Sequence, residues 1–528
     1  MSRWKLQTDD VKIAGALHLA IFALVVSGLL PRAVVPFWAA AWVLWAAMVP
    51  VRTSVLLFAF AVPAFVAIPI TTDFDNFNMW RLAALVIFLK WFFTTQSWLG
   101  ALSGIFSWLR APHRYPAASL CAVLFIMAAA SVTQATDVVA ALRRIIYFAN
   151  ALLVPFVAFM LVRGEPQWRR QLIRAIGWSG ALVIAAGFVQ LAATYLMDVY
   201  AFMRIWGEGI QMRQFGELWS LIAVRVGNTW LAYYGPQLSL RMFSLFPDSH
   251  SFPIYVIFAL GGIIPFALAP IWERTRAGIT SLRPLLRTRG TLAVLWIVLG
   301  FLAAILSGTR GIWAASVGLV PLSLVLFWWM RRTGTDGARR SFWKYLTAWL
   351  AAFYLLFAIA WPIFVSPQFL LSGGDRNLLS DRLRSIVDFG ETSNSARLEI
   401  WGASLRSIGN NPLLGVGIGN FPTVLGQNVI LAKAGSTAHN IWLHVAAETG
   451  LISLIAFVLL WAVLFRDAWR LYTASPDPNV APFAGWMLFA VPWVAAYLLT
   501  DATLLDERVL LQFGILFALM RGSVHQYS

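Results

Sequence analysis

The chain has 528 residues, of which 60% are hydrophobic and only 12% charged, with 40 Lys plus Arg against 23 Asp plus Glu. This balance excludes a soluble domain of that size and is typical of a polytopic membrane protein. The excess of basic residues is scattered through short loops and does not gather on one soluble face, so we expect no nucleic-acid partner.

The apolar segments predict an all-α protein with about fourteen transmembrane helices, because one helix needs about 20 apolar residues to cross the bilayer. The first follows MSRWKLQTDDVK without a cleavage pattern, so we expect a spanning helix and not a removed signal peptide. The candidate spans lie near 12–30, 33–49, 54–71, 79–100, 116–134, 145–162, 175–197, 252–271, 291–306, 311–330, 345–365, 441–465, 482–500 and 503–520. Charged residues interrupt the last of these. Cys121 lies in an apolar run and is the only cysteine, which excludes disulfides and thiolate metal sites.

The loop charges predict that both termini are cytoplasmic. Counting alternate loops from an inner N-terminus, the basic stretches RGEPQWRRQLIR, ERTRAGITSLRPLLRTR and RRTGTDGARRSFWK all fall on the inner side, as the positive-inside rule requires. The excess of positive charge is therefore explained by membrane orientation.

Two long segments fall on the outer side, where we expect function to be carried. The predicted organisation is N-terminal transmembrane helices in 1–197, a periplasmic loop in 198–251, central transmembrane helices in 252–365, a periplasmic helical hairpin in 366–440 and C-terminal transmembrane helices in 441–528. The first loop has aromatic residues that suit interfacial helices, namely Trp206, Phe215, Trp219 and Trp230.

A polar stretch, 395–450, interrupts the apolar C-terminal part. Ser395 is placed to cap a helix that carries Arg397, and its apolar stripe would be formed by Leu398, Trp401, Leu405 and Ile408. The GVGIGN segment that follows resembles a dinucleotide fingerprint, but no strand precedes it, so we interpret it as a turn.

Four outer positions can carry chemistry: Arg241, Arg310, His439 with Asn440, and Asp501. Arg310 lies in SGTRG between two apolar spans, where small residues and exposed N–H groups suit an anion site; outer-edge arginines can also simply snorkel to lipid headgroups. The imidazole of His439 can accept a proton from a hydroxyl at neutral pH. The alternative for His439 is a structural role, with Asn440 or Thr437 as a helix cap.

A metal site at His439, His444 and Glu448 is not expected. Only His444 and Glu448 have the spacing that shares one helical face, and a third ligand is missing. As an intramembrane carboxylate, Glu448 is itself a functional candidate, although it can also cap backbone or pair with an arginine.

These motifs resemble the O-antigen ligase and polymerase superfamily of bacterial envelope glycosyltransferases. The resemblance covers about residues 240–520 and lies in SNSARLEIWGASLRSIGNNPLLGVGIGNF, then STAHNIWLHVAAETGLISLIAFVLLW, the SGTRG turn and an Arg before an FP motif. Where many relatives have Asn, this chain has PDSHSF, so His250 or Ser249 replaces it.

The resemblance implies a GT-C-like, metal-independent and inverting glycosyltransferase without cofactors, in the bacterial inner membrane with its active site on the periplasmic face. It uses an undecaprenyl-diphosphate-linked oligosaccharide as donor. His439 would be the catalytic base, and Arg241 and Arg310 would hold the diphosphate. Further candidates are Asn440, Asp501, His250, Glu448 and Arg397.

The acceptor is not specified by these motifs. A polymerase adds the glycan to a repeat unit, with a chain-length regulator as a further partner, and a ligase adds it to lipid A core or to a protein. The large number of expected helices favours the polymerase. A flippase for lipid-linked sugars and a glycan-binding scaffold remain alternatives from other classes.

Overall fold

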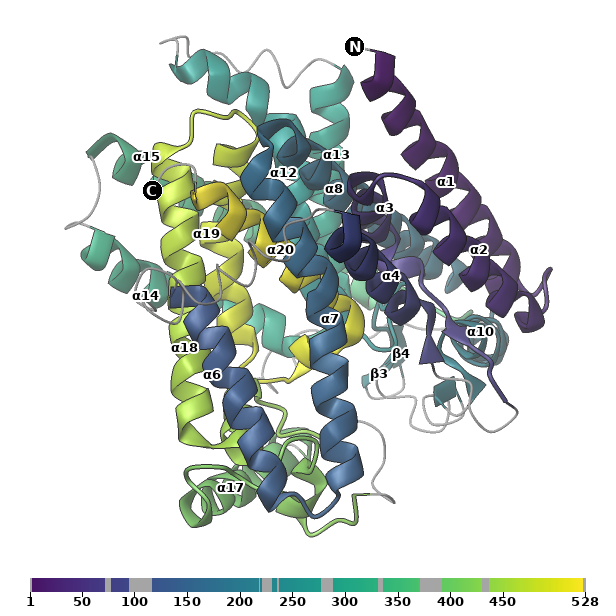
Figure 1. Ribbon diagram of the computed structural model, residues 1–528, viewed down its shortest axis with the longest axis vertical. Coiled ribbons are helices and arrows are strands. Elements are labelled where there is room, and N and C mark those ends of the chain that lie inside the picture. The colour runs from purple at the N-terminus through teal and green to yellow at the C-terminus, as the bar shows by residue number, and fades with distance from the viewer. Residues whose placement is uncertain are drawn as a thin grey trace.

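The computed structural model describes residues 2–71, 77–94, 116–217, 219–220, 230–234, 237–276, 288–330, 336–370, 392–429 and 436–525. Within them the protein is a bundle of helices with two short antiparallel strand pairs (Figure 1). The expected all-α polytopic membrane architecture is confirmed.

The N-terminal helices form one side of the bundle (Figure 1). They are α1 (Ser2–Ser27), α2 (Val35–Met48), α3 (Val51–Ala61) and α4 (Met79–Thr94). A small pair, β1 (Ala67–Ile68) with β2 (Phe77–Asn78), joins α3 to α4. Each of these two strands has only two residues, too few to show as a strand pattern in the sequence.

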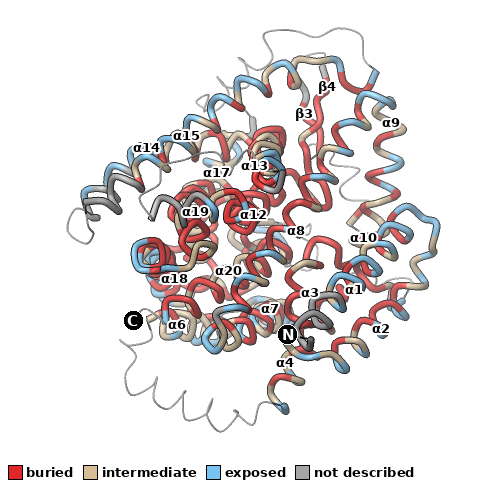
Figure 2. The backbone as a smooth tube through the Cα atoms, turned by 90° about the horizontal axis from the view of Figure 1, so that it is seen from above, coloured by how far each residue is buried: buried red, intermediate tan, exposed pale blue. Residues whose placement is uncertain are grey.

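The centre of the molecule is formed by helices that are apolar on most of their circumference. Figure 2 shows α12, α19 and α20 largely buried, whereas α14 and α15 project outward. The remaining long helices are α6 (Pro116–Ser131), α7 (Val138–Gly164), α8 (Pro166–Ala193), α12 (Ser251–Arg276), α13 (Thr288–Leu306), α14 (Arg310–Met330), α15 (Asp336–Val365), α18 (Ile441–Ala474), α19 (Val480–Tyr497) and α20 (Glu507–Val524).

Among the described residues, eight helices are long and apolar enough to cross a membrane, or up to nine if one bent pair counts as a span. The bent pair is α13 with α14, which meet at 115°. The sequence divided this region into two full spans because the apolar residues are nearly continuous there. Other expected spans are short, as in the 14 residues of α2 and the 11 of α3. The number of about fourteen spans therefore stays a prediction.

The first outer segment is folded against the bundle. It contains α9 (Val199–Phe202), a π-helix (Met203–Gln211), α10 (Met212–Phe215) and the hairpin β3 (Leu231–Tyr234) with β4 (Gln237–Leu240). Trp206 and Trp230 are only 7% and 0% exposed, so their side chains pack inside the protein, whereas the location of this segment at the membrane interface stays a prediction. Trp230 stacks on Phe243 and donates Nε1–H to the Pro247 carbonyl, so it packs inside the protein.

The second outer segment contains α17 (Thr392–Asn410), at one end of the bundle (Figure 1). The predicted cap at Ser395 is wrong, because the helix already includes Thr392. The predicted apolar stripe is also wrong in part. Ile408 is buried, but Leu398 and Leu405 are 45% and 59% exposed, and the small Ser404 takes the buried position between them. A 3₁₀ turn (Phe421–Leu425) follows.

Candidate active site

The loop before α12 is held rigidly by side chains from three other segments. Gln190 Oε1 accepts the N–H groups of Phe243 and Ser244, at 3.0 Å each. Gln211 and Trp230 donate to the carbonyls of Phe246 and Pro247 in the same loop. Because buried amides that pair with backbone fix a loop in one conformation, the side chains of residues 248–250 are presented in a defined direction.

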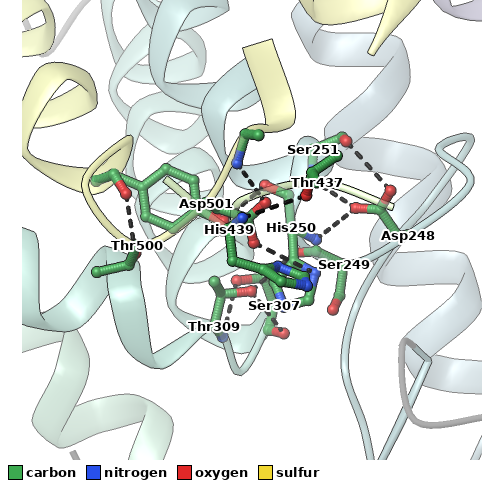
Figure 3. A network of polar contacts seen from close by, with 12 residues as sticks. Asp248, Ser249, His250, Ser251, Ser307, Thr309, Thr437, His439, Thr500 and Asp501 are labelled. Atoms are coloured by element: carbon green, nitrogen blue, oxygen red, sulfur yellow. Dashed lines mark hydrogen bonds and ion pairs between the residues drawn. The ribbon is translucent and has the colours of Figure 1, made fainter. Parts of the chain in front are cut away.

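Asp248 forms the last turn before α12. Its Oδ1 accepts the N–H groups of His250 and Ser251, at 2.8 and 2.7 Å, and Ser251 Oγ donates to its Oδ2 (Figure 3). Asp248 therefore acts as the N-cap of α12. In the sequence, the PDSHSF motif had indicated His250 or Ser249 and not this aspartate. Burial raises the pKa of Asp248 above its usual value, and the nearby carboxylate of Asp501 adds to this effect.

His250 joins two of the predicted site residues. Arg241 Nη2 lies 2.8 Å from His250 Nε2, and His250 Nδ1 lies 3.8 Å from Asp501 Oδ2. Burial lowers the pKa of His250 to about 3, against the opposing effect of Asp501, and the positive charge of Arg241 lowers it further. A neutral imidazole therefore accepts from Arg241 at Nε2 and turns its Nδ1–H toward Asp501. The carboxylate of Asp501 also accepts the N–H of Ala502.

The SGTRG turn lies between this loop and the end of α19. Thr309 Oγ1 donates to the Ser249 carbonyl at 2.8 Å, and a Cβ on Gly311 would lie 2.3 Å from Thr500 Oγ1 (Figure 3). Only glycine permits that approach. The contacts of Thr309 and Gly311 thus place the backbone of Arg310, the first residue of α14, next to this cluster. The sequence predicted a tight turn here, and the 115° bend between α13 and α14 confirms it.

His439 precedes α18 with a strained backbone. Its φ of 46° is in the left-handed region, which non-glycine residues rarely adopt. Trp401 of α17 donates Nε1–H to the Ala438 carbonyl at 3.0 Å, and the N–H of Ile441 bonds to the carbonyls of Leu498 and Asp501. The residues on both sides of His439 are therefore held, so that the strain is stably maintained.

The imidazole of His439 belongs to the cluster. It is close enough to His250 to lower the pKa of that residue, as is the guanidinium of Arg397 from α17. Its Nδ1 is buried and has no hydrogen-bond partner among the described residues. Within the same residues, no hydrogen bond or ion pair joins the Asp501 carboxylate to His439; the contact of Asp501 is with His250.

Asn440 caps α18, as the sequence allowed. Its Oδ1 accepts the N–H groups of Trp442 and Leu443, at 3.0 and 3.1 Å. The side chain is 7% exposed. Asn440 thus fixes the start of α18 directly after His439, and its side-chain oxygen is used in hydrogen bonds to the backbone.

Glu448 lies away from the cluster, where α18 is broken. Gly450 has a φ of 87°, and the GVGIG segment fills the break: Val416 and Gly417 donate to the carbonyls of Ala447 and Glu448, and Leu451 donates to Pro412. Glu448 Oε1 accepts the N–H of Phe421, so its predicted role as a cap for polar backbone is confirmed.

A metal centre can be assessed only for the described residues. Among them, no group of three or more His, Cys, Asp or Glu could hold a metal ion. His444 Nε2 lies 3.5 Å from Glu448 Oε1, the i,i+4 pair that the sequence indicated, and His439 precedes their helix.

Several residues of the cluster were not selected from the sequence as functional: Asp248, Thr309, Tyr497 and Thr500. Tyr497 OH donates to the His250 carbonyl at 3.4 Å, from the end of α19. Asp248 and Thr309 were adjacent to motif residues and could have been included on that basis. Nothing in the apolar sequence before Asp501 marks Tyr497 or Thr500, because their position follows from helix packing.

Comparison with known proteins gives one family match. Residues 295–458 match the family model described as O-antigen ligase, which confirms the resemblance over that segment and supports a role in glycan ligation or polymerisation. The match includes Arg310, Arg397 and His439, whereas Arg241 and Asp501 lie outside it. No curated protein matches the chain.

Proposed function

We propose that the protein transfers a glycan from an undecaprenyl-diphosphate carrier to a sugar hydroxyl of an acceptor repeat unit, as an O-antigen or exopolysaccharide polymerase. The observation that carries the proposal is the convergence of His439, on a strained backbone, with the Arg241–His250–Asp501 chain and the SGTRG turn. Backbone strain that the surrounding contacts maintain is characteristic of functional sites.

His439 acts as the general base. Its imidazole accepts the proton of the acceptor hydroxyl while the hydroxyl oxygen bonds to the anomeric carbon of the donor. The bond from that carbon to the diphosphate oxygen breaks in the same step, with its electron pair leaving on the diphosphate. Displacement from the opposite side inverts the anomeric configuration.

Arg241 and Arg310 stabilise the leaving group. Negative charge develops on the diphosphate oxygens, and preorganised guanidinium groups lower the energy of that charge most effectively in a site of low dielectric constant. Neutral His250 orients Arg241 without adding a second positive charge beside it. Two cations supply the neutralisation without a divalent ion, so the reaction is proposed to be metal-independent.

The site faces the periplasm in this proposal. The loop charges predict that both termini are in the cytoplasm of a bacterial inner-membrane protein, and the cluster lies at the starts of α12 and α18, which follow the two outer segments, and at the C-terminal end of α19. The donor lipid enters from the bilayer, and a chain-length regulator is a further partner.

A ligase that transfers the glycan to lipid A core is the second candidate. The description of the matched family, O-antigen ligase, favours it. Both reactions use the same base and the same leaving group, so they differ only in the acceptor.

Purified protein in proteoliposomes, supplied with a labelled lipid-linked oligosaccharide of defined mass, tests the proposal. We expect products heavier by whole repeat units, formed equally well with EDTA present. Loss of activity with EDTA would overturn the metal-independent mechanism. Leaflet exchange of the donor without a new glycosidic bond would overturn the enzyme and identify a transporter.

A further inference from the structure

An apolar cavity of about 230 Å³ is lined by residues of α6, α7, α18 and α20. These four helices lie near one another in the bundle (Figure 1). At its outer end the cavity is lined by Ile441 and Leu504, two and three residues after His439 and Asp501. Deeper in the bundle Leu460 and Phe517 line it. The lining suits a hydrocarbon chain that runs along the helices.

Two arginines lie beside the outer part of this cavity, around one aromatic ring. Arg81 Cζ is 5.5 Å and Arg144 Cζ 5.6 Å from the centre of the Tyr147 ring. Arg144 also lies over Phe148, which lines the cavity, at 5.7 Å. Tyr147 OH donates to the carbonyl of Leu505, another lining residue, so the arginine pair and the cavity share a wall.

The charges of these arginines are not neutralised by ion pairs. Within the described part of the chain, neither Arg81 nor Arg144 forms a hydrogen bond or an ion pair, and Arg81 Nε is buried. The nearby carboxylate of Glu507 already accepts from Asn78 Nδ2 and Trp80 Nε1, at 2.6 and 2.7 Å.

The other charged groups around Tyr147 do not change this balance. They are Asp506 and Glu507, and Arg508 Nη1 lies 3.9 Å from Glu507 Oε1. Asp506 caps α20, and its Oδ1 accepts the N–H groups of Arg508 and Val509. Two arginines and two carboxylates therefore surround the ring, and within the described part of the chain only the arginines have no hydrogen bond or ion pair, so they are available to an anion.

The polar lining of the cavity includes His444 and Glu448, and His444 Nε2 lies 3.5 Å from Glu448 Oε1. His444 is 3% exposed and lines the cavity, and neither of its ring nitrogens has a hydrogen bond in the described structure. Because neither ring nitrogen is hydrogen-bonded, a polar ligand group that enters the outer end of the cavity can bond to this imidazole.

We propose that this cavity, with Arg81 and Arg144, is a second lipid site that binds the phosphate and the adjoining isoprene units of the carrier of the acceptor glycan. The assignment to the acceptor rests on the proposed function. Guanidinium groups bind phosphate oxygens, and the apolar walls accept the isoprene units. The outer end of the cavity adjoins His439 and Asp501, so a glycan attached to that phosphate reaches the candidate active site. An ordinary phospholipid carries no glycan and would gain nothing from this position.

Lipid binding tests the site independently of transfer. Full-length protein in phosphatidylcholine nanodiscs is titrated with undecaprenyl phosphate, and bound lipid is counted by native mass spectrometry. We expect wild type to bind undecaprenyl phosphate at two sites. In R81Q/R144Q the affinity of one of these sites should be at least tenfold weaker, and R143Q should bind as wild type does. Arg143 is the exposed neighbour of Arg144 on α7. Unchanged binding by R81Q/R144Q would overturn the site.

Two further binding experiments test whether the lipid occupies this cavity and whether it is an isoprenoid lipid. Filling the cavity with A128L should weaken the same binding event, whereas A129L, on the exposed side of α6, should not. Equal displacement of undecaprenyl phosphate by phosphatidylglycerol would overturn the isoprenoid assignment in favour of an ordinary phospholipid site.

Transfer kinetics test the acceptor assignment. R81Q/R144Q should raise KM for the lipid-linked acceptor at least tenfold and leave KM for the donor unchanged. Weakened lipid binding together with normal acceptor KM would overturn the acceptor role. Full transfer by H439A would contradict the proposed function and leave the lipid-binding result standing.

Discussion

The side chain that organises the candidate site is His250, which the sequence indicated only as a replacement in a family motif. Its Nε2 accepts from Arg241 and its Nδ1 faces Asp501, so one neutral ring orients a cation and is itself oriented by an anion. The chemically obvious residues, His439 and Arg310, could be selected from the sequence. The link between Arg241 and Asp501 could not, because 260 positions separate them in the chain.

Replacement of His250 tests this orienting role. H250N keeps an acceptor for Arg241 and a donor for Asp501 and should retain most of the transfer activity. H250L keeps the volume and removes both groups. Since a hydrogen bond to a charged group contributes about 1.5–3 kcal/mol, H250L should lose about 10- to 100-fold in activity. Steady-state kinetics on both variants check this, and equal activities would exclude the role.

The lowered pKa of His250 makes stability depend on pH. Below its ordinary pKa of about 6.5 the unfolded chain takes up a proton at this residue, whereas the folded protein does so only near the lowered value of about 3. The free energy of unfolding should therefore fall as the pH falls from about 6.5 toward 3. Thermal melting in detergent should show a smaller loss for H250N over this range, and parallel curves would contradict the account.

At the scale of elements, α18 is where sequence and structure differ most. The sequence shows one long apolar helix, but Gly450 breaks it, and residues 412–417 bond to the free backbone groups at the break. Asn420 extends the same docking to α7 by exchanging hydrogen bonds with the backbone of Asp137. The Gly-rich turn could be predicted as a turn, but the surface it docks against is formed only by tertiary contacts.

The break at Gly450 predicts that alanine substitution lowers stability much more at Gly450 than at Gly409. A Cβ on Gly450 would lie 2.0 Å from the Leu413 carbonyl oxygen, and the backbone there has a positive φ. G450A should therefore lower stability by at least about 1–3 kcal/mol and reduce transfer. G409A in α17 is the matched control, because nothing lies within 4 Å of its added Cβ. Melting temperatures of both variants measure this, and similar values would contradict a required break.

At the scale of the whole molecule, the account depends on which end of the bundle faces the periplasm. Composition could predict a membrane protein, and the orientation inferred from loop charge stays a prediction. Neither could predict the number of spans, because short helices such as α2 and bent ones such as α13 with α14 are as apolar as full spans.

Cysteine labelling measures the orientation. On a C121S background, L413C lies at the end of the bundle that carries α17, where Leu413 is 64% exposed, and G164C lies at the far end of α7. An impermeant maleimide should label L413C in intact cells and G164C only after permeabilisation. The reverse pattern would put the site on the cytoplasmic face and exclude the periplasmic reaction.

The central claim is that His439 is the base of a glycan-transfer reaction. The most direct test is the product mass spectrum of purified wild type and H439A, each reconstituted with the same undecaprenyl-diphosphate oligosaccharide and each shown to melt at the same temperature. Wild type should give a ladder spaced by whole repeat units, and H439A should give unreacted donor alone. A ladder from H439A at the wild-type rate would contradict the account.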